Sequence, residues 1–223
     1  MGTPDFCPLP LYLNLSSMKM LVWNCHGAGN SVFKRTIRDL LKSHNPSIIV
    51  LIETKVQLSS MGLFFNNLGF AASTFVDPVG KCGGIWLLWD PFKVIVLALD
   101  ANPQVIYVKI KRDHFPNWIL SVVYARPNPT KRDTLWENLE SMEDNMSEPW
   151  LAVGDFNDFA SQNEKRSFVP SHSHARTRKF AARLNMCNLM DLGCSGPHLT
   201  WSNGRQGMAN TLERLDRVAC NTE

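Results

Sequence analysis

The chain has 223 residues, of which 44% are hydrophobic and 19% charged, with a formal net charge of +3. This length is enough to bury a core in one large domain or two small ones. The composition excludes collagen-like, coiled-coil and disordered chains. No apolar run is long enough to span a membrane, and the first residues have no basic segment, so we expect neither a membrane span nor a signal peptide. Six cysteines without metal-binding spacing favour a reduced protein of the nucleus or cytoplasm rather than a secreted one.

Residues 1–17 have no clear periodicity, and we expect a disordered extension before a domain that spans residues 18–223. Apolar runs predict strands at 19–23, 47–52, 83–89, 94–99, 104–110, 118–124 and 150–154, with shorter ones near 198–201 and 213–218. Apolar residues at helical spacing predict helices over 31–43, around 135–142 and around 180–187. Strands without strict alternation with helices indicate an α/β sandwich with mixed or antiparallel sheets.

Positive charge is concentrated between residues 161 and 190. This segment contains six basic residues and one acidic residue. It has the charge to face a polyanion. A solvated loop and helix surface is the alternative interpretation, and charge alone favours that alternative.

Five polar residues stand at or just beyond the end of an apolar strand: Asn24, Glu53, Tyr124, Asp155 and Asn157. Each alone is explained by a turn or a cap, but five together indicate a site, because a strand end holds a side chain rigidly near solvent. Carboxylate and amide oxygens without Cys or His suit Mg²⁺ or Mn²⁺ rather than zinc. Glu53 and Asp155 would suffice as ligands, and the two asparagines would orient water or donate to phosphate.

Four motifs at these positions carry a family resemblance: Trp23-Asn24, Ile52-Glu53-Thr54-Lys55, Gly154-Asp155-Phe156-Asn157 and Arg214-Leu215-Asp216. Their order resembles the endonuclease/exonuclease/phosphatase superfamily. The endonuclease domain of LINE-type (non-LTR) retrotransposons of plants is the most similar branch. Segments 21–27, 83–86, 123–125, 132–139, 200–203 and 213–217 support this resemblance.

The resemblance implies a four-layer α/β sandwich, in which helices flank two packed, mixed and mainly antiparallel sheets. It implies a Mg²⁺-dependent (or Mn²⁺-dependent) DNA endonuclease that nicks its target for retrotransposition by in-line attack of water. The implied roles are Glu53 as main metal ligand with Asn24 in the metal site, Tyr124 on the scissile phosphate, Asp155 on the attacking water, Asn157 on phosphate charge, and Asp216 orienting a catalytic histidine.

DNA is the implied partner, without a membrane or a small-molecule cofactor. The candidates for DNA contact are Lys55, Arg126, Arg176, Arg178 and Trp201, although Trp201 fits a core position equally well. A retrotransposon of this kind would also encode a reverse transcriptase domain, which this sequence does not contain.

The sequence departs from the family pattern at its last motif. The family ends in a Ser-Asp-His strand, and this chain contains no Ser-Asp-His segment. None of its histidines lies in that context: His26, His44, His114, His172, His174 and His198. We therefore expect a fold that lacks its last strand, an exposed sheet edge, and weak or no activity.

Two other functions stay open. One is a non-catalytic retroelement relic or nucleic-acid-binding protein. The other is an inositol-phosphate or lipid phosphatase or phosphodiesterase of the same superfamily.

Overall fold

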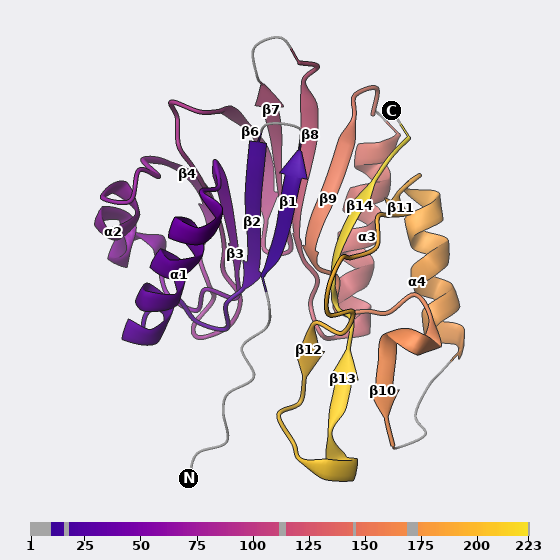
Figure 1. Cartoon of the computed structure of the whole chain (residues 1–223). Coiled ribbons are helices and arrows are strands. Elements are labelled where there is room, and N and C mark those ends of the chain that lie inside the picture. The colour runs from indigo at the N-terminus through magenta and orange to yellow at the C-terminus, as the bar shows by residue number, and fades with distance from the viewer. Residues whose placement is uncertain (1–9, 16–17, 112–114, 145, 169–173, 223) are drawn as a thin grey trace.

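The computed structural model of the chain describes residues 10–15, 18–111, 115–144, 146–168 and 174–222. Two large sheets pack face to face, and helices cover their outer faces (Figure 1). The layers therefore run helix, sheet, sheet, helix, which confirms the predicted α/β sandwich. In the described part of the chain, no helix is both long and apolar enough to cross a membrane.

The first large sheet has the strand order β1-β2-β3-β5-β4. Its strands are β1 (Leu11–Leu15), β2 (Met18–Asn24), β3 (Ile48–Ile52), β4 (Ala72–Val76) and β5 (Ile85–Trp89). β2 and β3 are parallel, and the other neighbours are antiparallel. Helices α1 (Ser31–His44) and α2 (Gly62–Asn66) lie on its outer face (Figure 1).

The second large sheet has the order β11-β14-β9-β8-β7-β6. Its strands are β6 (Ile95–Asn102), β7 (Val105–Lys111), β8 (Trp118–Tyr124), β9 (Trp150–Asp155), β11 (Met190–Asp191) and β14 (Asp216–Cys220). β8 and β9 are its parallel pair. Helices α3 (Pro129–Glu143) and α4 (His174–Met186) cover its outer face (Figure 1).

A small third sheet projects from one end of the sandwich (Figure 1). It has the order β10-β13-β12, with β10 (Lys165–Ser167), β12 (Trp201–Ser202) and β13 (Thr211–Glu213). Short 3₁₀ turns occur at η1 (Leu58–Ser60), η2 (Gln162–Glu164) and η3 (Gly207–Ala209). Strands of two or three residues are too short for an alternation to show, so this sheet was not predicted as a separate unit.

The central strands are apolar throughout because both of their faces are covered. All five residues of β3 are buried. In β2, Met20 and Val22 belong to the core between the sheets, while Leu21 and Trp23 belong to the core beneath α1 and α2. A third core joins the second sheet to α3 and α4. This explains why the predicted strands read as continuous apolar runs.

The prediction of a disordered extension at residues 1–17 is wrong for residues 11–15. These residues form β1, which pairs antiparallel with β2 from Leu11↔Val22 to Leu15↔Met18. Leu11, Leu13 and Leu15 alternate toward the core between the sheets. The alternation was present in the sequence but is only five residues long. Residues 1–9 and 16–17 lie outside the described part of the chain.

The exposed sheet edge expected from the sequence is not found at β14, whose residues Asp216, Arg217, Val218 and Ala219 are buried. β1 covers β2 along its length, whereas β14 pairs on its outer side with only the two-residue strand β11. β14 is therefore the second strand from this edge of the sheet, and its inner side is paired with β9.

Gly154 allows the end of β9 to lie close to β8 in its own sheet and to Ile52 of the other sheet. Its φ is +133°, and a Cβ there would lie 2.1 Å from Val123 O and 3.0 Å from Ile52 Cδ1. We expect Gly154→Ala to lower the free energy of unfolding by at least ~2 kcal/mol through overpacking and backbone strain. This corresponds to a melting temperature about 5 °C lower.

Gly62→Ala is the matched control for this substitution. Gly62 has space for a Cβ and begins helix α2, so we expect no loss of stability there. Equal melting temperatures for the two variants, measured by circular dichroism, would contradict the close-approach argument.

Candidate active site

Strand register gathers the predicted site residues at one end of the sandwich. Tyr124 pairs with Asp155 across parallel β8 and β9, and Asp216 pairs with Asp155 across β14 and β9. In the other sheet, Asn24 pairs with Ile52 across parallel β2 and β3, so Glu53 lies immediately beyond that pair. Parallel strands end at the same edge, which is why residues far apart in sequence meet here.

Asp155 is the buried centre of the group. Its Oδ2 accepts a hydrogen bond from Asn24 Nδ2 at 2.9 Å, and its Oδ1 accepts one from the Asn157 backbone N–H at 2.8 Å. Asn24 Nδ2 also lies 3.4 Å from Glu53 Oε1. One asparagine amide therefore joins the carboxylates of the two sheets.

Two cationic or ionisable groups face Glu53. His26 Nδ1 and Lys55 Nζ lie 2.9 Å and 3.1 Å from Glu53 Oε2. Burial raises the pKa of Glu53, but His26 and Lys55 outweigh it and hold that pKa at about 2. His26 was not predicted to lie in the site, although it stands only two residues after Asn24.

Asp155 and Asp216 are a coupled pair with raised pKa values. Burial is the main cause for both, and the Asp216 charge raises the pKa of Asp155 further. The pKa of Asp216 is about 6, against an ordinary value of 3.8, although Thr200 and His26 lower it. Each of these carboxyl groups therefore binds a proton more readily than it would in water.

Tyr124 and Asn157 supply neutral donors beside the carboxylates. Burial, followed by the charges of Glu53 and Asp155, raises the pKa of Tyr124, so its hydroxyl stays protonated. Asn157 Nδ2 donates to Ala125 O at 2.7 Å and lies 3.3 Å from Asp155 Oδ2. A phosphate group between these side chains would meet donors rather than repelling charges.

The backbone is strained around the site. His26, Glu53, Lys55 and Asn157 all have φ between +49° and +57°. Such conformations are uncommon for residues other than glycine and concentrate at functional sites. Gly84 supports the turn, since its carbonyl accepts from Thr54 N–H at 3.3 Å and a Cβ would lie 2.2 Å from Thr54 Oγ1.

The donor set fits a hard divalent cation. Glu53 and Asp155 provide two carboxylates, which is the number that Mg²⁺ commonly takes from a protein. Asn24 Oδ1 is buried and has no hydrogen-bond partner among the described residues, so the amide retains an unused oxygen. The same part of the chain contains no group of three or more His, Cys, Asp and Glu side chains with metal-binding geometry. Water and substrate would therefore complete the coordination.

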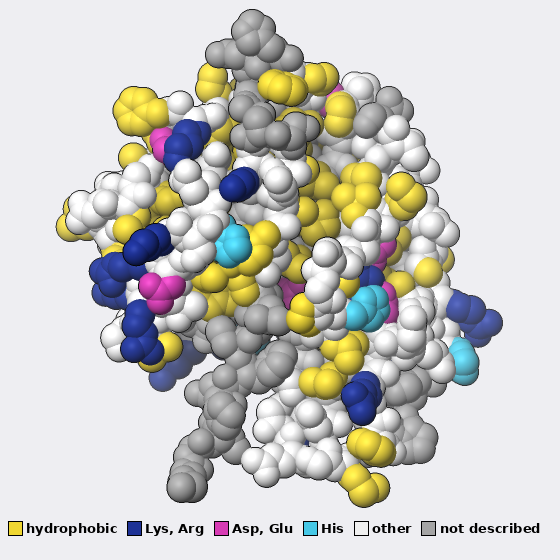
Figure 2. Space-filling view, viewed as in Figure 1, with side chains coloured by type: hydrophobic (Ala, Val, Ile, Leu, Met, Phe, Trp, Pro, Cys, Tyr) yellow, Lys and Arg dark blue, Asp and Glu magenta, His cyan; other side chains and the backbone are white. Residues whose placement is uncertain are grey.

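The basic segment at 161–190 is largely neutralised by ion pairs. Lys165 Nζ lies 2.6 Å from Glu213 Oε1, and Arg176 Nε lies 2.6 Å from Asp158 Oδ1. Lys179 and Arg183 both pair with Asp133. On the face seen in Figure 2, Lys and Arg side chains gather instead over α1, whose sequence includes Lys34, Arg35, Arg38 and Lys42.

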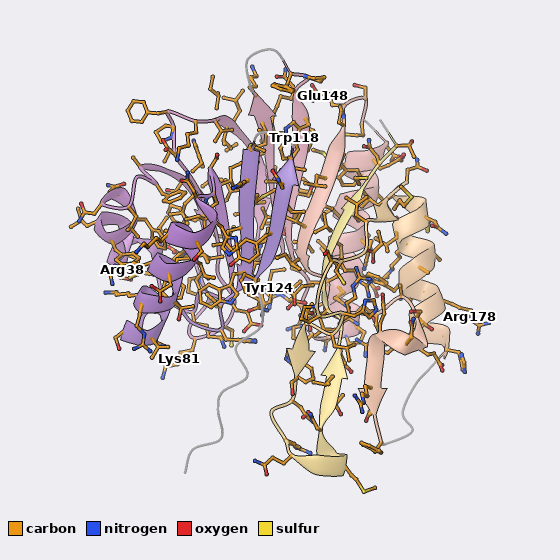
Figure 3. All side chains as sticks on the ribbon, viewed as in Figure 1. Arg38, Lys81, Trp118, Tyr124, Glu148 and Arg178 are labelled. Atoms are coloured by element: carbon orange, nitrogen blue, oxygen red, sulfur yellow. The ribbon has the colours of Figure 1, made fainter. Side chains whose placement is uncertain are left out.

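The predicted DNA-contacting residues fall into two groups. Lys55 touches Glu53, and the charge of Arg126 acts on Tyr124, so both belong to the site. Arg176 is bound to Asp158, and Arg178 is exposed on α4, well apart from Tyr124 in Figure 3. Trp201 is half-buried in β12 of the small sheet.

The Thr200-Trp201 segment also anchors the site directly. Thr200 Oγ1 accepts hydrogen bonds from the backbone N–H groups of Leu215 and Asp216, both at 3.1 Å. The threonine thus fixes the start of β14.

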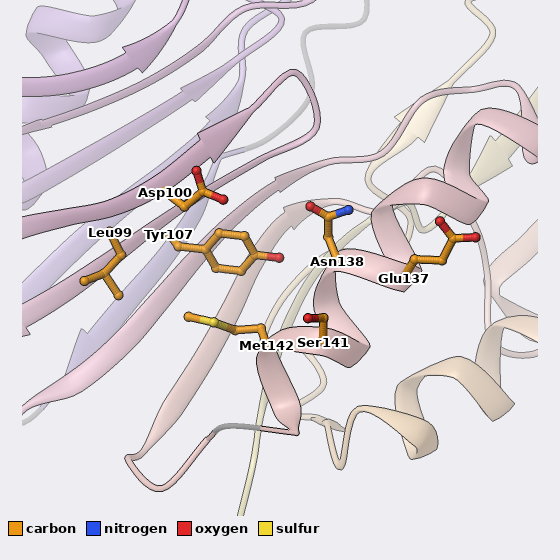
Figure 4. Close-up of a pocket in the computed structure, with 7 residues that line it drawn as sticks. All are labelled: Leu99, Asp100, Tyr107, Glu137, Asn138, Ser141 and Met142. Carbon is orange, nitrogen blue, oxygen red and sulfur yellow. The ribbon is translucent and has the colours of Figure 1, made fainter.

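A cavity of about 370 Å³ lies elsewhere, between strands β6 and β7 and helix α3 (Figure 4). Its lining includes Leu99, Tyr107 and Met142 and none of the predicted site residues. The hydroxyl of Tyr107 is buried there without a partner in the described part of the chain. The site described above is therefore an open strand-end site, separate from this cavity.

The raised pKa of Asp216 predicts a stability change with pH in metal-free protein. A carboxyl group with a raised pKa stabilises the fold at low pH and loses that contribution as pH rises through about 6. In EDTA at about pH 8, we expect Asp216→Asn to raise the free energy of unfolding by on the order of 1–3 kcal/mol. At about pH 4 the gain should vanish, because the wild-type carboxyl is then protonated. A gain that is independent of pH in urea denaturation would contradict this cause.

Comparison with known proteins gives the same architecture. The sequence matches the Endonuclease/Exonuclease/phosphatase family over residues 21–222. No curated protein matches the sequence. Similar solved structures include a 3′ phosphatase, NExo from Neisseria bound to a product DNA hairpin (17% identity, TM-score 0.72), which covers 92% of this chain and 87% of that one. The endonuclease domain of TRAS1, a telomere-specific non-LTR retrotransposon, has 14% identity and TM-score 0.67, with 92% and 85% covered.

An AP endonuclease from Archaeoglobus fulgidus is a third similar structure, with 15% identity and TM-score 0.68, covering 92% of this chain and 86% of that one. Identities this low establish a shared fold alone. The family match covers almost the whole sequence, and the four-layer sandwich agrees with it. The chain therefore belongs to the Endonuclease/Exonuclease/phosphatase family.

Proposed function

We propose that this protein is a Mg²⁺-dependent (or Mn²⁺-dependent) endonuclease that hydrolyses DNA phosphodiester bonds, and that it derives from a plant-type LINE retrotransposon. The observation that carries the proposal is the meeting of Asn24, Glu53 and Asp155 from both sheets, beside the neutral donors Tyr124 and Asn157. Similarity to the TRAS1 endonuclease domain and to a DNA-bound phosphatase supports DNA as the substrate.

The arrangement assigns a step to each side chain. A metal ion held by Glu53, with Asn24 in the metal site, would stabilise the charge that develops on the phosphate. The Tyr124 hydroxyl and the Asn157 amide donate hydrogen bonds to non-bridging phosphate oxygens. Asp155 orients the attacking water and accepts its proton. Asn24 keeps the Asp155 carboxylate aligned through its 2.9 Å hydrogen bond.

Turnover is slow in this proposal. Asp216 is in place beside Asp155, but no histidine of the described residues donates a hydrogen bond to it. A missing acid or base commonly costs about 10²–10⁴-fold in rate. The protein would then nick DNA weakly.

Asp155→Asn tests the proposal most directly. Nicking of supercoiled plasmid in Mg²⁺ should fall by about 10²–10⁴-fold, because the amide no longer accepts the water proton. Glu53→Gln should shift the Mg²⁺ requirement to higher concentration, since one metal-binding carboxylate is lost.

Three results would reject the proposal. The first is plasmid nicking by Asp155→Asn at the wild-type rate, and the second is nicking by the wild-type protein in EDTA. The third is a wild-type protein that neither nicks DNA nor gains stability from Mg²⁺. Release of phosphate from inositol phosphates or from 3′-phosphorylated DNA, without nicking, would reassign the same site to phosphatase chemistry.

DNA affinity should depend on Lys55 more than on Arg178. Lys55 lies at the site and Arg178 lies on the outside of α4, so only the first is placed to neutralise a phosphate there. We expect Lys55→Gln to weaken binding of a short duplex and to reduce the slope of log affinity against log salt by about one. Fluorescence anisotropy in a salt series measures this for Lys55→Gln and for Arg178→Gln, and equal slopes for these two variants would contradict the placement.

A further inference from the structure

Asp158 directly follows the Gly154-Asp155-Phe156-Asn157 segment and has no part in the reaction proposed above. It is buried, with a side chain only 9% exposed. Its Oδ2 accepts from Arg132 Nη2 at 3.1 Å, and its Oδ1 accepts from Arg176 Nε at 2.6 Å. Arg132 comes from α3 and Arg176 from α4, so one carboxylate joins the two helices that cover the second sheet.

Each of these arginines also holds a loop of the site. Arg132 Nη1 donates to the backbone oxygens of Arg126 and Pro127 at 3.1 Å and 2.8 Å, in the loop that follows Tyr124. Arg176 Nη2 donates to Asn157 O at 2.9 Å. The carboxylate of Asp158 therefore links the loop after Tyr124 to the loop that carries Asn157.

Asn157 depends on such support. Its φ is +49°, in the left-handed region that non-glycine residues rarely adopt, so its conformation has to be imposed by contacts. Its amide reaches across to Ala125 O at 2.7 Å, between the two linked loops. A shift of either loop would change the distance between the Asn157 amide and the Tyr124 hydroxyl.

Stability alone is a poor explanation for this cluster. Buried ion pairs lose hydration, and well-packed apolar residues commonly stabilise a fold as well or better. The cluster is instead placed where it bonds to backbone atoms of both site loops. Arg217 adds a further bond from its Nη2 to Asp158 O at 3.2 Å.

We infer that Asp158, Arg132 and Arg176 form a positioning triad that sets the separation of Asn157 and Tyr124 for a phosphodiester held between them. The inference rests on the proposed function. The triad orients the backbone of the groups that meet the substrate. It also gives Arg176 a role different from DNA contact.

The test compares Asp158→Asn and Arg176→Gln with Asp133→Asn. Asp133 also joins α3 to α4, through Lys179 and Arg183, but touches neither site loop. We expect kcat for plasmid nicking to fall about 10–100-fold in the two triad variants, since small displacements of reacting groups have effects of this size. KM for DNA should change little, and Asp133→Asn should keep the wild-type rate. If Asp158→Asn does not fold, the Arg176→Gln variant decides the test, because the Arg176 side chain is partly exposed and its loss disturbs the fold less.

Two further readouts separate positioning from simple loss of structure. Ethylguanidinium should restore part of the rate to Arg176→Ala. The side-chain NH₂ resonances of Asn157, assigned with Asn157→Asp, should shift in both triad variants and not in Asp133→Asn.

The resonances decide the inference even if the wild-type protein does not nick DNA, a result that would reject the proposed function alone. Unchanged Asn157 resonances in the triad variants would overturn the triad. Equal losses of kcat in the triad variants and in Asp133→Asn would overturn it as well.

Discussion

The hydrogen bond from Asn24 Nδ2 to Asp155 Oδ2 joins the two sheets at the end where the site lies. A buried carboxylate is costly unless donors satisfy it, and Asp155 obtains one donor from each side: Asn24 from the first sheet and its own loop through Asn157 N–H. Gly154, the residue before Asp155, lies close to Val123 of the neighbouring strand and to Ile52 of the first sheet. The geometry of the site and the packing of the two sheets therefore both depend on how closely the strands approach each other at this end.

Many charged side chains of this protein form ion pairs within the fold. Most of the basic segment at 161–190 is engaged by carboxylates, so it offers less positive surface than its composition indicates. The side chains that remain near the carboxylates are Lys55 and His26, which lower the pKa of Glu53. Asp155 and Asp216 have the opposite environment, because burial and the charges of neighbouring carboxylates raise their pKa values. One site thus contains a carboxyl group whose pKa is lowered and two carboxyl groups whose pKa values are raised.

Much of the fold was predictable because its signals are local. β8 was predicted with the residues that the structure shows, and α1 differs by one residue at its end, where Asn45 adopts a left-handed cap. The elements that escaped are those with weak local signals. β4 alternates between half-buried and exposed residues, and β11 has two residues. β1 becomes part of the first sheet by pairing with β2, a contact that its own five residues do not specify.

The sequence by itself determined where strands end and which polar side chains stand there, because apolar runs and the residues that follow them are neighbours in the chain. Asn24, Glu53, Tyr124, Asp155 and Asn157 were found in that way. Only the tertiary structure decided their partners. His26 on Glu53, Thr200 beneath Asp216, and Asp158 between Arg132 and Arg176 are contacts between distant segments. Such contacts depend on strand register and on helices crossing a sheet, which no local pattern of residues specifies.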